Sequence, residues 1–216
     1  MKTYKLSAIN IPCEVAVFPL ANTILFPESE VPLYIFEPRY RQMLKDSMKG
    51  NKFIAISLFK AGWEKRSAEP VPSHEVVGVG YLRAVIDNPD GTAHILLRGA
   101  GRAKILRYIQ MRPYRIAKVE PLPDHIENPE ELLKLFPRLR KLFLQKVRWD
   151  SDNPGVIPKL PRDMNNPITL SHLASFLLRG NPYRKQDLLE TINCNNRIKY
   201  LIDLLEEEMH AYGSHN

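Results

Sequence analysis

The chain has 216 residues, of which 44% are hydrophobic, and its formal net charge at neutral pH is +7. A chain of this length buries roughly 70% of the surface that its unfolded form exposes, so we expect one domain or two small lobes. No apolar run approaches the roughly 18 residues of a membrane-spanning helix, and Asn10, Pro12 and Glu14 interrupt any signal-type segment at the start, which predicts a soluble chain.

The beginning of the chain has the pattern of short strands followed by one helix. Apolar alternation next to proline predicts strands over residues 14–18 and 32–36. Pro38 suits the first turn of a helix, because its missing N–H is not needed there. Apolar residues then recur at helical spacing up to Gly50, namely Tyr40, Met43, Leu44 and Met48.

The next stretch predicts a β-meander. Residues 53–59 form an apolar strand pattern, and a long loop to Ser73 follows it. The turn residues 88–91, which end in Asp-Gly, indicate a hairpin between strands 75–87 and 92–98. Strands over 101–109 and 114–119 continue the meander. A curled barrel could bury one face of these strands, supplied by Val76, Val79, Ile95, Leu97, Ile105, Ile116 and Val119.

A cluster of prolines over residues 121–129 separates this β region from a helical one. Apolar spacing predicts a long helix after Pro129, kinked or restarted at Pro137, and then a proline-rich loop over 153–166. Helices over 168–178 and 182–192 follow. Asn195 is the expected cap of the last helix.

The chain lacks the common catalytic patterns. It contains no phosphate-binding glycine loop and no glycine-flanked serine nucleophile, and its six histidines are scattered singly. Cys13 and Cys194 are too few for a disulfide framework, which predicts core-filling thiols and a reducing, cytoplasmic location. We therefore expect no enzymatic activity, no cofactor and no metal. A hydrolase with an unrecognised site stays a third hypothesis, which clustered carboxylates or histidines in a cleft would revive.

Basic residues are concentrated in two stretches, 91–119 and 132–149. Such stretches are often only the solvated side of strands and helices, but they can also form a surface that meets phosphates or acidic peptide. The candidate polyanion-binding residues are Arg98, Arg102, Lys104, Arg107, Arg112 and Arg115.

The opening of the chain resembles the amino-terminal substrate-binding domain of Lon-type proteases. The resemblance rests on residues 17–20 (VFPL), 25–27 (LFP) and 31–40 (VPLYIFEPRY), in that order and spacing. It continues through 77–80 (VGVG), the hairpin at 89–92 and the segment 97–105, and more loosely through the helical part. Three positions depart from the family pattern: Glu28 replaces a usual glycine, Tyr34 a common histidine and Ala103 a common phenylalanine.

The resemblance implies an α+β fold, with a PUA-like β pseudo-barrel over residues 1–122 and an α-helical bundle over 123–216. It also implies a non-catalytic module that recognises unfolded or client polypeptide, as an adaptor or substrate-recognition factor in protein quality control. The ATPase and peptidase domains of full-length Lon follow this region and are not in the sequence. The expected partners are client polypeptide and a protease or other protein machine, and a second copy of the chain is a further candidate partner.

The proposed contact residues are apolar. Extended peptide could bind along an unpaired barrel edge and across exposed aromatic side chains. The candidates are Phe26, Tyr34, Phe59 and Trp63. The alternative function is an RNA-binding protein that uses the barrel and the basic surface, and a steep salt dependence of binding would favour it.

Overall fold

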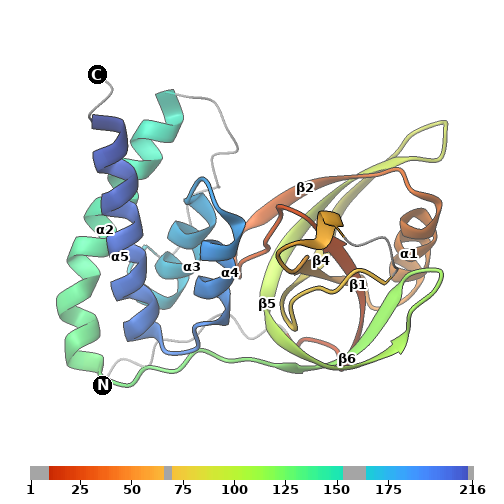
Figure 1. The fold of residues 1–216 in the computed structure, drawn as a ribbon, viewed down its shortest axis with the longest axis horizontal. Helices are drawn as coiled ribbons and strands as arrows, with labels where there is room; N and C mark the ends of the chain where they lie inside the picture. The colour runs from red at the N-terminus through yellow and green to blue at the C-terminus, as the bar shows by residue number, and fades with distance from the viewer. Residues whose placement is uncertain (1–9, 66–69, 153–163, 214–216) are drawn as a thin grey trace. The chain divides into compact units, whose positions relative to one another are not determined.

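The computed structural model describes residues 10–65, 70–152 and 164–213. The chain divides into two compact units, one comprising Ile9–Leu122 and the other comprising the chain from Pro123 onward. The first unit contains the strands and one helix, and the second is helical (Figure 1). The predicted α+β class, with a β lobe before an α lobe, is confirmed.

Five strands of the first unit close into a barrel, and the sixth, β2, pairs with the first part of β5. The sheet order is β2-β5-β4-β3-β1-β6, and β5 also pairs with β6, which completes the ring. β1 and β3 are parallel, whereas the other pairs are antiparallel. The strands are β1 (Glu14–Leu20), β2 (Glu30–Ile35), β3 (Phe53–Leu58), β4 (Val76–Asp87), β5 (Ala93–Gln110) and β6 (Arg115–Pro121).

β5 is one continuous strand of 18 residues, although the sequence predicted two strands, 92–98 and 101–109. Its first part pairs with β2 and β4, and its last part pairs with β4 and β6. The register shifts opposite Gly99 and Gly101, where Val79 pairs with Gly101 and the next residue, Gly80, pairs with Gly99. The glycines therefore mark a bulge that bends the strand, and do not end it.

The barrel interior is filled by small and branched side chains. Five of the seven predicted inner-face residues are buried. Val76 and Ile116 are only partly buried, because strand side chains alternate and their neighbours Val77 and Ala117 occupy the inner face. The central cluster consists of Val15, Val17, Ala55, Val77, Val79, Ala103, Ile105, Ala117 and Val119.

The predicted first helix is present as α1 (Pro38–Lys49), with proline in its first turn. Tyr40, Met43 and Leu44 are buried, whereas Met48 is exposed. The ring of Tyr40 packs on that of Phe18 in β1, with 4.3 Å between the ring centroids. This contact fixes the beginning of the helix against the end of the first strand. The long loop after β3 contains one short 3-10 turn, η1 (Trp63–Lys65).

The helical unit consists, in the part described, of α2 (Pro129–Asp152), α3 (Pro167–Leu177), α4 (Pro182–Glu190) and α5 (Cys194–Gly213). α2 and α5 lie side by side (Figure 1). Ion pairs join Glu131 to Lys199 at 2.6 Å and Arg138 to Glu206 at 2.7 Å, so the two helices run in the same direction. α2 passes through Pro137 as a single helix and does not restart there.

Two polar details of this unit correct the sequence-based expectation. Asn193, not Asn195, caps α5, since its side-chain oxygen accepts the N–H groups of residues 195 and 196. Asn195 is buried and donates to the carbonyl oxygen of Asn128 at 2.7 Å. Of the predicted loop 153–166, residues 153–163 lie outside the described residues. Asn166 caps α3 through the N–H groups of Ile168 and Thr169.

A fully buried arginine organises the interior of the helical unit. Arg197 forms an ion pair with Asp124, and it donates to the hydroxyl of Ser171 and to the carbonyl of Thr191. His172 contacts the second carboxylate oxygen of Asp124 at 3.0 Å. Removing one partner from such a buried network is expected to destabilise by about 3–5 kcal/mol, because it leaves the opposite charge uncompensated.

The segment between β1 and β2 lies against glycines of the barrel wall. A β-carbon at Gly78 would overlap the carbonyl oxygen of Leu25, and one at Gly99 would overlap that of Phe26. Both Leu25 and Phe26 are fully buried. Gly78 and Gly99 thus serve close packing, because the absence of a β-carbon lets another backbone approach the sheet.

We predict that Gly78→Ala lowers the free energy of unfolding by about 3 kcal/mol or more, since the clash is with backbone that cannot rotate away. Gly101→Ala is the matched control. Its β-carbon would lie 2.8 Å from the flexible end of Ile11, so we expect a loss of only about 1 kcal/mol. Urea denaturation of the two variants measures the difference, and equal losses would contradict this account.

Candidate functional site

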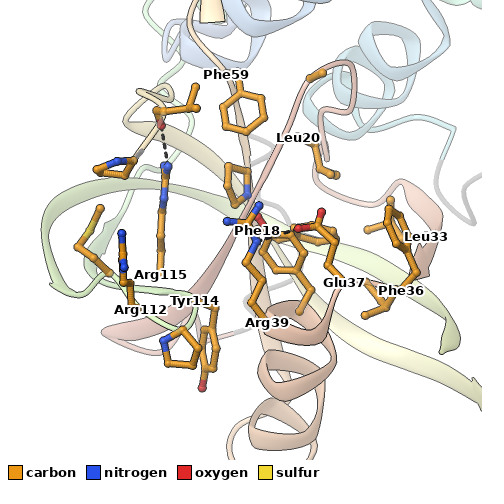
Figure 2. A pocket seen from close by; sticks show the side chains of 18 of the residues that line it. Phe18, Leu20, Leu33, Phe36, Glu37, Arg39, Phe59, Arg112, Tyr114 and Arg115 are labelled. Atoms are coloured by element: carbon orange, nitrogen blue, oxygen red, sulfur yellow. Dashed lines mark hydrogen bonds and ion pairs between the residues drawn. The ribbon is translucent and has the colours of Figure 1, made fainter. Parts of the chain in front are cut away.

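A groove of about 480 Å³ lies on the barrel unit (Figure 2). The ends of β1 and β2, the start of α1, the loop after β3 and the β5–β6 connection form its walls. The lining is mainly apolar and aromatic, and a few charged groups sit among these side chains. Grooves of this size and composition are typical binding sites.

One wall of the groove is an aromatic stack. Phe59 and Trp63 lie with their ring centroids 5.0 Å apart and nearly parallel. Phe59 follows β3 directly, and its N–H donates to the carbonyl of Leu20 at the end of β1. The backbone pairing of the two strand ends therefore positions the stack. Rigid aromatic side chains provide a large contact area at low entropic cost.

The end of β2 forms a second aromatic wall. The rings of Tyr34 and Phe36 stack at 5.9 Å, and the hydroxyl of Tyr34 hydrogen-bonds to Thr92 across the sheet at 3.1 Å. Phe36 is 58% exposed, an unusual degree for a phenylalanine. The two residues present an accessible apolar surface on a strand that is held in place.

Some charged side chains of the groove are paired with an opposite charge, and others contact neutral groups or are exposed. Glu37 and Arg39 form an ion pair at 2.9 Å. The guanidinium of Arg115 donates to the carbonyl of Val71 at 2.6 Å and to the hydroxyl of Ser73 at 3.3 Å, both neutral acceptors. Arg112 is exposed. In Figure 2, Arg112 and Arg115 lie on the side of the cavity opposite Leu33 and Phe36.

A hydrogen-bonded clasp between Tyr114 and Asp46 links the β5–β6 connection to the first helix. The hydroxyl of Tyr114 donates to the Asp46 carboxylate at 2.8 Å, and Gln110 donates to the carbonyl of Tyr114 at 2.9 Å. Burial and the neighbouring carboxylate raise the pKa of Tyr114 to about 12. The hydrogen bonds from Gln42 and Tyr114 lower the pKa of Asp46. The connection that carries Arg112 is thereby fixed in position.

The structure brings three of the four predicted peptide-binding residues together, since Tyr34, Phe59 and Trp63 all line the groove. Phe26 does not line it and must be removed from the candidate set, because its side chain is fully buried. Sequence reasoning missed Phe36. The available signal was strand alternation, because Phe36 follows Ile35 directly and a buried Ile35 leaves the next side chain on the exposed side.

The predicted polyanion-binding residues do not form one exposed set. Arg98 is bound to Glu28 at 2.8 Å and to Glu30 at 3.4 Å, and Arg102 is only 2% exposed. Lys104 and Arg107 are exposed on β5, whereas Arg112 and Arg115 line the groove. The alternation of β5 separates residues that are neighbours in the sequence.

Among the described residues, no group of three or more His, Cys, Asp or Glu side chains could hold a metal ion. Within the same ranges, no helix is both long and apolar enough to cross a membrane. Both cysteines are free thiols, but Cys13 is exposed, so the prediction that both fill the core is wrong for it.

The chain is similar to known proteases over most of its length. The family model of the ATP-dependent protease La (LON) substrate-binding domain matches residues 14–207. The Lon protease of Syntrophomonas wolfei is 30% identical over 91% of this chain, and that of Dictyoglomus thermophilum is 25% identical over 93%. The chain spans about a quarter of the length of these relatives, at 24% and 25% respectively.

Solved structures agree in fold. The N-terminal domain of Mycobacterium avium complex Lon protease has a TM-score of 0.66 and 20% identity, covering 89% of this chain and 98% of that one. A Lon N-terminal domain protein from Xanthomonas campestris has a TM-score of 0.62 and 18% identity, covering 88% and 97%. The predicted Lon-type architecture is thus confirmed.

We predict that one tyrosine ionises near pH 12, well after exposed tyrosines, and that Tyr114→Phe removes this transition. Because the folded pKa is raised, the stabilisation is complete below the ordinary value of 10 and is lost as pH rises from 10 towards 12. At neutral pH, Tyr114→Phe should cost about 1.5 kcal/mol. Absorbance titration at alkaline pH tests the ionisation, and urea denaturation tests the loss of stability. Ionisation of Tyr114 together with the exposed tyrosines would contradict the Tyr114–Asp46 hydrogen bond.

Proposed function

Because the chain belongs to the Lon substrate-binding domain family, we propose that it is a non-catalytic recognition module that binds unfolded polypeptide in the aromatic groove. One observation carries the proposal: aromatic residues from two separate segments, Tyr34 with Phe36 and the Phe59–Trp63 stack, line a single cavity. Apolar surface of this kind binds the side chains that folded proteins bury and unfolded chains expose.

The free edge of β2 supports binding of an extended segment. Among the described strands, β2 pairs with β5 alone. The carbonyl of Ser29 accepts the N–H of Gly99. Along an antiparallel strand, alternate residues direct their N–H and C=O groups toward the partner strand, so the backbone groups of Tyr34 point away from β5. A bound segment could pair with this edge, where backbone hydrogen bonds give affinity with little dependence on sequence.

We propose an adaptor role in protein quality control, in which the module captures a client in the reducing cytoplasm and delivers it to a protease or another protein machine. Free cysteines and an interior without a metal cluster in the described ranges are compatible with this role. RNA binding is not proposed, because the basic residues predicted for it are divided between buried, neutralised, groove and other exposed positions and do not form one surface.

We predict that Trp63→Ala weakens binding of an end-capped, unstructured peptide that contains phenylalanine by at least about tenfold, since the indole is a central aromatic contact. Trp149→Ala is the matched control, because it removes the chain's other tryptophan from the helical unit and leaves the groove intact. Fluorescence anisotropy measures the two affinities, and circular dichroism verifies folding. Equal affinities for both variants, or binding of RNA without any binding of peptide, would refute the proposal.

A further inference from the structure

The groove carries an excess of positive charge within its apolar surroundings. Among its described lining residues, Glu37 is the one carboxylate, whereas Arg39, Arg112 and Arg115 are cations. Glu37 neutralises Arg39 through their ion pair. The guanidinium of Arg115 donates to two neutral oxygens and lies over the ring of Tyr108, and Arg112 makes no hydrogen bond or ion pair with any other described residue. Two positive charges are therefore left without a carboxylate partner among the residues that the structure describes.

These two arginines are held in different ways. Two hydrogen bonds fix Arg115 to the loop that follows β3, so it contributes charge from a set position. Arg112 lies in the β5–β6 connection, whose backbone the Tyr114–Asp46 and Gln110–Tyr114 hydrogen bonds hold on either side. Its side chain is exposed while its backbone is fixed. An exposed guanidinium on a fixed turn can bind a carboxylate with two parallel hydrogen bonds.

Resting on the proposed function, we infer that the groove selects client segments in which a large apolar or aromatic side chain is accompanied by an aspartate or glutamate side chain. The apolar side chain packs between the aromatic walls, and the carboxylate binds Arg112 beside Arg115. In an extended segment, residues two apart project to the same side, which allows both contacts at once. Segments with lysine or arginine in that place are disfavoured by like-charge repulsion.

The overall charge acts in the same direction. A formal net charge of +7 attracts acidic segments over distances up to about the screening length, roughly 8 Å at physiological salt. This general attraction does not depend on one residue, whereas binding at Arg112 does. The two effects can therefore be separated by comparing Arg112 with an exposed arginine outside the groove. Arg107 on β5 is exposed and does not line the cavity.

The test uses four peptides of threonine and valine with one central phenylalanine, and three of them are capped at both ends. Two residues after the phenylalanine they carry glutamate, glutamine or lysine, and the fourth carries glutamine and a free terminal carboxylate. We expect the glutamate peptide to bind about fivefold more tightly than the glutamine peptide, with lysine weakest. Arg112→Gln should abolish the glutamate preference and Arg107→Gln should retain it. Arg112→Glu should reverse the order in favour of lysine.

The outcomes separate this inference from the proposed function. Equal affinity for the glutamate and glutamine peptides, with binding still lost in Trp63→Ala, overturns the acidic preference and leaves the aromatic groove in place. If Arg107→Gln removes the glutamate preference as fully as Arg112→Gln does, the preference comes from general charge attraction. That outcome also overturns the inference. If only the free-carboxylate peptide binds tightly, Arg112 recognises the terminal carboxylate of a chain and not an acidic side chain. That outcome overturns the inference. Failure of all four peptides to bind overturns both proposals.

Discussion

The close approach of the Leu25–Phe26 backbone to the barrel wall is the constraint on which the groove depends. That segment connects β1 to β2, and the ends of both strands line the cavity. It lies against Gly78 and Gly99, where any β-carbon would overlap it. A tight turn follows, in which the hydroxyl of Ser29 donates to the carbonyl of Phe26 and accepts its N–H. The path of the connection, and so the position of Tyr34, is set by glycines on other strands.

Glu28 shows what this turn requires. Its φ is +66°, in the left-handed region that favours glycine, and Pro27 precedes it, as in a type II turn. Here the backbone N–H of Glu28 donates to the carbonyl of Gly99, and the side chain binds Arg98 at 2.8 Å. The ion pair offsets part of the backbone strain. It also neutralises Arg98, so this side chain does not contribute to a polyanion-binding surface.

Local patterns in the sequence predicted the elements, and the tertiary contacts decided which side chains remain accessible. Pro38 and the apolar spacing after it were enough to predict α1. The family motif and the aromatic composition were enough to select Tyr34, Phe59 and Trp63. Burial of Phe26 and Arg102 could not be predicted, because it depends on which strand faces which. The Tyr114–Asp46 clasp joins residues 68 positions apart, and no local pattern signals it.

The most direct test of the central claim, that unfolded polypeptide binds in the aromatic groove, is site-specific photo-crosslinking. A benzophenone side chain replaces Phe36, which is 58% exposed in the groove, or Ile86, which is 65% exposed on β4 and does not line the cavity. The account predicts that an unfolded polypeptide is crosslinked from position 36 and much less from position 86. Equal crosslinking at both positions, or crosslinking at position 86 alone, would contradict it.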